Sequence, residues 1–189
     1  KTKRQNSLEL VASDFELSYS AEKTTKSGFL EDFIYFKTKK IKHLFNQLSV
    51  KKGPYRLFDI TYSEGEFIAK EVVRSTMLYI KTSKDIPVFT LDREGLLERF
   101  YALAGYKDIA IDNHSDFSKR FYLRGENAKG IKTLFTDELV RFFESNAYYH
   151  IESSKDGLLI YSKERVASIK EIKALLDFGI RLNAIINKV

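Results

Sequence analysis

The spacing of hydrophobic residues changes in character near residue 92. Before that point, apolar and polar residues alternate over Tyr55–Tyr62, and residues 67–81 and 88–91 are rich in Val, Ile, Thr, Tyr and Phe. Such alternation is typical of strands that turn one face towards a core. We therefore expect an antiparallel β meander over residues 40–91. Within it, residues 41–50 fit either a strand or a helix, and we favour a strand.

Turn residues add detail to this meander. Gly53-Pro54 and Ser63–Glu66 have the composition of turns between neighbouring strands. Residues 67–81 are long for one strand, so we expect a bend or bulge within them.

The first 36 residues are predicted to fold onto the body of the protein. Leu8 and Val11 belong to an apolar series at near-helical spacing, which predicts a short helix over residues 3–14. Residues 20–28 read as a polar loop. Residues 29–36 are too apolar for a solvated linker, and we expect them to pack on the body.

Beyond residue 92, helix-start residues become frequent. Asp92 can cap a helix over residues 95–104, and Thr136 can cap one that ends near Asn146. A carboxyl or hydroxyl oxygen at this position accepts one of the free N–H groups of the first turn.

The C-terminal part is predicted to contain a hairpin followed by the longest helix. Residues 147–153 and 157–162 read as two strands joined by a tight turn. Ser168-x-x-Glu171 is a capping box, which opens a helix over about residues 169–187.

These elements predict an α+β fold, in which an antiparallel β meander is followed by a mixed helical and β-hairpin half that shares one core with it. We divide the chain into an N-terminal helix and packed segment (residues 1–39), an antiparallel β subdomain (40–91) and an α+β subdomain with the long C-terminal helix (92–189).

The composition and the absence of certain motifs exclude several kinds of functional site. The 189 residues include no Cys, which excludes a disulfide framework, a thiolate zinc site and a Cys nucleophile. Neither a Gly-x-Ser-x-Gly nor a Gly-x-Gly-x-x-Gly motif occurs. No window of apolar residues is long enough to predict a transmembrane helix. We assign no catalytic residue, metal or cofactor and lean against an enzyme.

The net charge of +6 is concentrated near the start of the chain. Residues 1–52 carry 11 Lys and Arg against 6 Asp and Glu, whereas residues 53–189 carry 21 against 20. A nearly neutral body argues against a nucleic-acid surface that covers the whole domain.

Six lysines form the candidate contact with an anionic surface. They are Lys37, Lys39, Lys40, Lys42, Lys51 and Lys52. Lysines are attracted to anionic lipid headgroups, and by their charge residues 37–52 can also hold nucleic acid. The alternative is a solvated strand edge, where Lys prevents pairing with another sheet. A membrane contact requires Lys37–Lys42 to lie on the same side as Lys1–Arg4.

A second cluster keeps an enzymatic alternative open. Asp112, His114 and Asp116 share one face if the segment is extended, and O and N donors at this spacing can ligate a metal. The alternative function is therefore a metal-dependent or hydrolytic enzyme centred on these three residues. In the structural interpretation, which we favour, Asp112 ends a strand and Asp116 caps the next helix.

Seven short motifs occur in a distinctive order. They are Phe58-Asp59-x-x-Tyr62, Pro87-x-Phe89-x-Leu91, Asp108-Ile-Ala-Ile-Asp112, Phe117-Ser118, Tyr122-Leu-Arg-Gly125, Leu134-Phe135-Thr136 and Leu158-Leu-Ile-Tyr161. In this order they resemble an uncharacterised family of bacterial membrane-anchored proteins, in which one or two N-terminal membrane helices precede a cytoplasmic domain. The resemblance covers most of the chain and implies a topology, but no activity, cofactor or catalytic residue.

This resemblance implies that residues 1–39 are juxtamembrane, with Lys1, Lys3 and Arg4 just inside the membrane. Because the chain opens on Lys1 rather than Met, we expect a preceding segment to carry the anchor. The predicted location is the cytoplasmic side of the inner membrane. The predicted function is a non-enzymatic interaction domain that binds an unidentified protein partner or the anionic membrane surface, with nucleic acid as a less favoured ligand.

Overall fold

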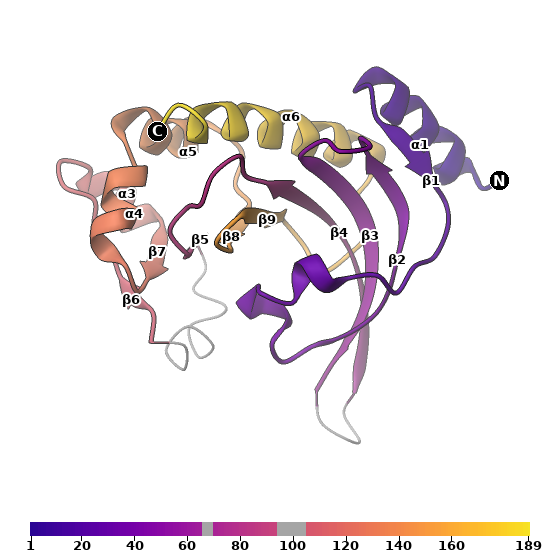
Figure 1. Cartoon of the computed structure of the whole chain (residues 1–189), viewed down its shortest axis with the longest axis horizontal. Helices are drawn as coiled ribbons and strands as arrows, with labels where there is room; N and C mark the ends of the chain where they lie inside the picture. Colours follow the sequence, from indigo (N-terminus) through magenta and orange to yellow (C-terminus); the bar gives the residue numbers. More distant parts are fainter. Residues whose placement is uncertain (66–69, 94–104) are drawn as a thin grey trace.

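The fold is built on one long antiparallel sheet. The computed structural model describes residues 1–65, 70–93 and 105–189. Within these residues, strands pair in the order β1-β2-β3-β4-β9-β8-β5-β7-β6 (Figure 1). Their bounds are β1 Ser18–Ser20, β2 Lys40–Ser49, β3 Tyr55–Glu64, β4 Glu71–Lys81, β5 Phe89–Asp92, β6 Lys107–Asp108, β7 Tyr122–Gly125, β8 His150–Ser153 and β9 Gly157–Tyr161.

Helices flank this sheet and complete an α+β fold, which confirms the predicted class. The described helices are α1 Lys3–Asp14, α3 Ser115–Arg120, α4 Ala128–Leu134, α5 Asp137–Ser145 and α6 Ile169–Ile186. Two 3₁₀ turns, η1 Gly28–Leu30 and η2 Ile34–Phe36, belong to the segment that was expected to pack on the body.

Side-chain caps start the long helices where the sequence predicts them. Ser168 and Glu171 form the predicted capping box at the start of α6, and Thr136 caps α5. Each cap satisfies backbone N–H groups that the first turn leaves free. The helix predicted over residues 95–104 lies outside the described residues. The end of the predicted turn at Ser63–Glu66 and the start of the strand predicted from residue 67 lie outside them as well.

The connection of the strands differs from a simple meander. β2, β3 and β4 follow one another as predicted, but β4 then pairs with β9, through Leu78↔Ile160 and Lys81↔Gly157. β5 pairs instead with β8 and β7. The C-terminal hairpin is therefore inserted between β4 and β5, and this long-range pairing left no local signal in the sequence.

The expected bulge lies in a different strand. β4 pairs with β3 without interruption from Glu71 to Ile80, whereas the register of β2 shifts between Ile41 and His43 and between Phe45 and Leu48. Within the second shift, Asn46 has a φ of 48°, a left-handed conformation that Asn tolerates better than most residues. Of the bend or bulge expected within residues 67–81, the bulge is therefore wrong over the described part of that strand.

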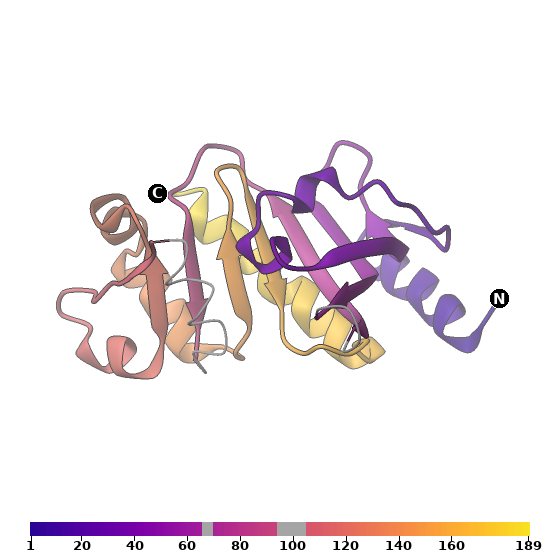
Figure 2. The same cartoon turned by 90° about the horizontal axis from the view of Figure 1, so that it is seen from below.

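Hydrophobic side chains pack on both faces of the sheet, because successive residues of a strand point to opposite sides. One face carries the larger cluster, in which Leu57 and Leu158 pack with Leu176 of α6. The other face carries Phe58, which packs with Phe33 of the cover segment, as we call residues 28–36. Figure 2 shows the cover segment in front of the sheet and α6 behind it. The prediction that this segment packs on the body is confirmed.

A buried acid holds the cover segment in place. The carboxylate of Glu152 in β8 is 3% exposed, and it accepts hydrogen bonds from the backbone N–H groups of Ile34 and Tyr35. Burial raises the pKa of this carboxyl to about 8, against the opposing effect of the two hydrogen bonds and of the positive charges of Lys37 and Lys39.

Candidate anion-binding site

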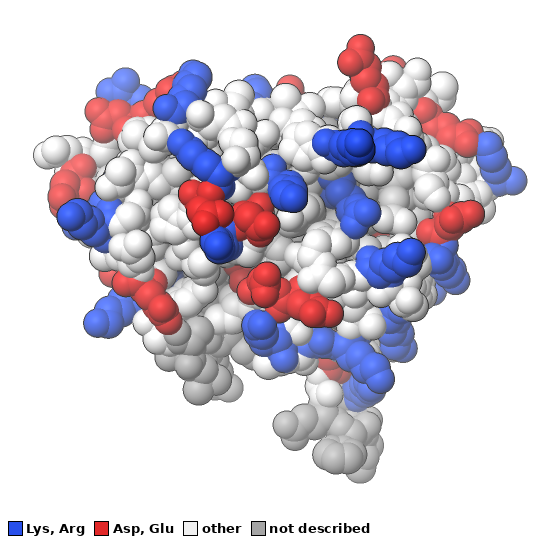
Figure 3. Space-filling model, viewed as in Figure 1, with Lys and Arg blue, Asp and Glu red and all other residues white. Residues whose placement is uncertain are grey.

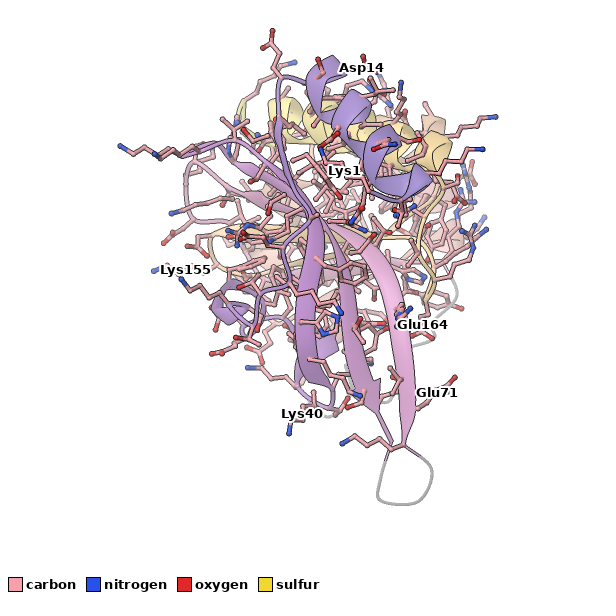
Figure 4. All side chains as sticks on the ribbon, turned by 90° about the vertical axis from the view of Figure 1, so that its right-hand side faces the viewer. Lys1, Asp14, Lys40, Glu71, Lys155 and Glu164 are labelled. Atoms are coloured by element: carbon pink, nitrogen blue, oxygen red, sulfur yellow. The ribbon has the colours of Figure 1, made fainter. Side chains whose placement is uncertain are left out.

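The six predicted lysines fall into two groups at opposite ends of β2. Lys37, Lys39, Lys40 and Lys42 lie at its start, and Lys51 and Lys52 follow its last residue. Ten residues of strand span about 30 Å, so the groups do not form the continuous basic stripe required of a nucleic-acid surface. Figure 4 shows Lys40 near the β3–β4 hairpin end and Lys1 well away from it, so the two predicted membrane-facing groups do not share one end.

The side chain of Lys39 is buried in the fold and does not belong to the exposed surface. Its side chain is 4% exposed, and its ammonium group lies 3.2 Å from the Glu64 carboxylate. The same group lies 4.0 Å from the centre of the Tyr35 ring, where the ring face attracts a cation. Lys37, Lys40 and Lys42 are exposed.

At the other end of β2, Lys51 and Lys52 border the cationic pocket, as we call a cavity of about 490 Å³. Its charged lining residues are Lys51, Lys52, Arg56, Lys81 and Asp156, and its aromatic lining residues are Phe29, Tyr55 and Tyr79. The volume lies in the range of small-molecule binding sites, about 300–1,000 Å³. Figure 3 shows Lys and Arg side chains gathered over the part of the molecule that contains β2–β4.

The strand register explains why these residues meet. Tyr55 of β3 pairs with Ile80 of β4, and Lys81 of β4 pairs with Gly157 of β9. The β2–β3 turn, the end of β4 and the β8–β9 turn therefore lie at the same end of the sheet. The tight β2–β3 turn requires a left-handed residue, and Lys52 supplies it with a φ of 70°.

Gly157 shapes one wall of the pocket. A Cβ atom at this position would lie 2.6 Å from a ring carbon of Tyr79, closer than two carbon atoms can pack. The absence of a side chain at Gly157 therefore lets the Tyr79 ring lie across the β8–β9 turn. Burial raises the pKa of the Tyr79 hydroxyl, and the negative charge of Asp156 raises it further.

The pocket carries an excess of unneutralised positive charge. Within the described residues, the side chains of Lys51, Lys52, Arg56 and Lys81 form no ion pair, and Asp156 is the single acidic side chain in the lining. The guanidinium of Arg56 instead lies 4.6 Å from the centre of the Phe29 ring. A guanidinium beside a ring keeps its planar fork of N–H groups, whose geometry suits bidentate contact with an oxyanion.

Phe29 links the pocket to the cover segment. Its ring centre lies 4.8 Å from that of Tyr79 and 5.7 Å from that of Phe58. Aromatic pairs at these distances are stabilised beyond their burial. The wall that supports Arg56 is therefore rigid on its inner side.

A smaller cavity of about 300 Å³ adjoins the cationic pocket and shares Lys52, Gly53, Pro54 and Lys81 with it. Asn183 and Asn187 near the end of α6 line its far side. Both cavities are thus bordered by the same two lysines, which face them from the β2–β3 turn and from the end of β4.

The sequence pointed to only part of this site. Lys51 and Lys52 were predicted, but Arg56, Lys81 and Asp156 were not. Arg56 and Lys81 look like ordinary alternating strand residues, and only the pairing of β4 with both β3 and β9 brings them together.

The three residues of the enzymatic alternative do not converge. Nε2 of His114 lies 2.6 Å from the Asp137 carboxylate, Asp112 pairs with Lys132 at 3.7 Å, and Asp116 pairs with Lys119 at 3.9 Å. His114 is the residue that precedes α3, and its hydrogen bond lowers the pKa of Asp137.

A metal centre needs several donors directed at one point. Across the described ranges, no group of three His, Asp or Glu side chains has an arrangement that could hold a metal ion. Asp112, His114 and Asp116 therefore do not form the centre on which the enzymatic alternative was based.

Comparisons with known proteins identify a similar fold but no family. No family model matches the chain, and no curated protein matches it. A crystal structure of the mycobacterial trehalose monomycolate transport factor A, TtfA, is similar, with a TM-score of 0.57 over 98% of this chain and 95% of that chain. The sequence identity is 10%, so the likeness concerns the fold alone.

The predicted membership of an uncharacterised family of bacterial membrane-anchored proteins is wrong. The solved structure that resembles this chain is a transport factor, and no family model supports the resemblance that the seven motifs suggested. Among the residues the structure describes, no helix is both long and apolar enough to cross a bilayer. The guanidinium of Arg4 binds the buried carboxylate of Asp59, and the juxtamembrane place inferred for residues 1–39 stays a prediction.

Proposed function

We propose that this chain is a non-enzymatic interaction domain that binds an anionic membrane surface through the cationic pocket. The observation that carries the proposal is that Lys51, Lys52, Arg56 and Lys81 converge on one cavity and that none of them forms an ion pair with an acid of the described residues. Elsewhere, cations such as Lys39 and Arg4 are held by carboxylates and are not available to a ligand.

The charges are sufficient for reversible docking. Each Lys or Arg near an anionic leaflet contributes about 1 kcal/mol, so four give about 4 kcal/mol, or roughly a thousandfold increase in affinity over a neutral surface. Exposed charges are screened by salt. Binding is therefore expected to weaken steeply as ionic strength rises.

The similar solved structure is compatible with this proposal. It is a factor in the transport of trehalose monomycolate, a lipid. At 10% identity it transfers no residue role to this chain, and the proposal does not extend to that lipid. The predicted location on the cytoplasmic side of the inner membrane fits an anionic surface, because the cytoplasmic leaflet is negatively charged. The location and an unidentified protein partner both stay predictions.

Co-sedimentation with vesicles tests the proposal. Wild type should bind vesicles that contain an anionic lipid and not neutral phosphatidylcholine vesicles. The Lys52→Glu/Lys81→Glu variant should lose more than about thirtyfold in affinity, because at least two favourable charges are removed. The matched control is Lys119→Glu/Lys129→Glu, on α3 and α4 at the far end of the sheet (Figure 1), which makes the same change in net charge.

Four outcomes of this experiment support or reject the proposal. Loss of binding in the pocket variant alone supports the proposal. Absence of wild-type binding to anionic vesicles would reject it. Equal loss in the control would show that binding depends on net charge, and loss in a Lys40→Glu/Lys42→Glu variant instead would move the contact to the start of β2.

A further inference from the structure

We infer that the cationic pocket recognises a phosphorylated polyol, such as the glycerol phosphate of a lipid headgroup, rather than negative charge in general. This inference rests on the proposed function and names the ligand of the same site. It follows from the size of the pocket and from the different chemistry of its two sides.

The size of the cavity points to a headgroup. About 490 Å³ accommodates a small polar molecule. The next residues along β3, Leu57 and Phe58, belong to the two packed clusters and are fully buried. An acyl chain would therefore remain outside, and the ligand that enters is the polar end of the lipid.

One side of the pocket is suited to a phosphate. Arg56 lies against Phe29, with its Cζ 4.6 Å from the ring centre, and the planar fork of N–H groups of an arginine matches two oxygens of one phosphate. Lys52 and Lys81 approach from the β2–β3 turn and from the end of β4. They supply point charges that are tolerant of the direction of the oxygens.

The other side of the pocket is suited to hydroxyl groups. Asp156, from the β8–β9 turn, is an acceptor of hydrogen bonds, and a carboxylate that accepts from hydroxyl donors forms strong bonds. The same negative charge repels a second phosphate or a carboxylate. Tyr79, whose ring lies against the β8–β9 turn, adds a hydroxyl group to the lining. A ligand with one phosphate and neighbouring hydroxyls satisfies both sides, because Lys52, Lys81 and Arg56 bind the phosphate and Asp156 accepts from a hydroxyl.

Two lipids of equal charge provide the test. Phosphatidylglycerol and phosphatidylserine each carry one net negative charge, but only the first presents a diol. Wild type is expected to prefer phosphatidylglycerol vesicles by about tenfold at equal mole fraction, the effect of one charge-assisted hydrogen bond. Asp156→Asn should equalise the two lipids while binding to phosphatidylserine is retained or strengthened.

The control is Asp85→Asn. Like Asp156→Asn it removes one negative charge, but it does so in the connection between β4 and β5. Asp85 pairs with Lys155 at 3.3 Å and does not line the pocket. This variant should keep the preference for phosphatidylglycerol. A loss of preference in Asp85→Asn equal to that in Asp156→Asn would overturn the inference, because it would assign the effect to charge alone.

The results separate this inference from the proposed function. Equal wild-type binding to the two lipids overturns the inference and leaves membrane docking intact, whereas no binding to either rejects both. Calorimetry with glycerol 3-phosphate then distinguishes a ligand that is free in solution from one that is part of a lipid headgroup. Binding without vesicles supports the phosphorylated-polyol chemistry and places the ligand in solution, and a preference seen only on vesicles places it in the membrane.

Discussion

Arg4 and the buried Asp59 form an ion pair that joins the first helix to the centre of the sheet. Nη2 of Arg4 lies 3.0 Å from Oδ1 of Asp59 and Nε lies 3.2 Å from Oδ2, and the carboxylate is 1% exposed. Asn46 and Thr76 donate further hydrogen bonds to it, at 2.9 and 2.6 Å. Every donor of this network comes from a different element, so the carboxylate joins α1, β2, β3 and β4.

We expect Arg4→Met to lower the free energy of unfolding by about 3 kcal/mol, because removal of one partner leaves a buried charge without its counter-ion. Urea unfolding monitored by circular dichroism measures this change. Lys3→Met, an exposed neighbour on the same helix, is the control and should stay within about 0.5 kcal/mol of wild type. Equal effects of the two substitutions would mean that the ion pair contributes nothing beyond local helix stability.

The buried Glu152 makes stability depend on pH. Its pKa is about 8 in the folded protein and 4.5 in its ordinary state, so the folded state binds more protons than the unfolded state between these values. The contribution of Glu152 to the free energy of unfolding is therefore fully present below pH 4.5 and is lost as the pH rises through 8. The free energy of unfolding falls by at most about 1.4 kcal/mol per pH unit.

Glu152→Gln removes the titration and keeps one acceptor oxygen, so one of the N–H groups of Ile34 and Tyr35, which donate to different oxygens of Glu152, loses its acceptor at every pH. The difference in unfolding free energy between variant and wild type, measured from pH 5 to pH 8, should shift in favour of the variant as the pH rises. Parallel pH profiles for the two proteins would contradict the buried-acid description.

Gly157→Ala is expected to destabilise the protein by about 1–3 kcal/mol, because its Cβ would overlap the Tyr79 ring and force it to move. Thermal unfolding provides the measurement. Gly28→Ala is the matched control, since nothing lies within 4 Å of the Cβ that it adds, and it should be neutral or slightly stabilising. A neutral Gly157→Ala would show that the Tyr79 ring is free to leave the wall of the pocket.

Lys39 and Lys40 are neighbours in sequence with different expected roles. Lys39→Met should cost about 1 kcal/mol of stability, because its contacts with Tyr35 and Glu64 are lost. Lys40→Met should have no such effect, since Lys40 is exposed. Unfolding curves for the two variants check this. A larger loss of stability in Lys40→Met than in Lys39→Met would contradict this description. Lys39 would then belong with the exposed lysines, as the sequence analysis assumed.

Local chemistry in the sequence was sufficient for much of the fold. The capping box of Ser168 and Glu171 and the cap at Thr136 fix where α6 and α5 begin, since a cap depends on residues three positions apart. Alternation over Tyr55–Tyr62 similarly fixed β3, and the apolar run over residues 29–36 indicated the packed cover segment.

Features that depend on distant pairing were missed. Nothing near residue 81 reveals that β9 lies beside β4, because that contact closes a loop of more than 70 residues. The lining of the pocket depends on it, so Arg56, Lys81 and Asp156 could not be grouped from the sequence. The ion pair of Arg4 was missed for the same reason, since its partner Asp59 lies in a strand remote in sequence.

The most direct test of the central claim is to map the contact residue by residue. Amide chemical shifts of the full chain, recorded as phosphatidylglycerol nanodiscs are added, should change most at residues 49–56, 79–81 and 155–157, which border the cationic pocket. Salt should reverse these changes. Changes that centre on residues 37–42, or that spread evenly over the exposed lysines, would contradict the assignment of membrane binding to this pocket.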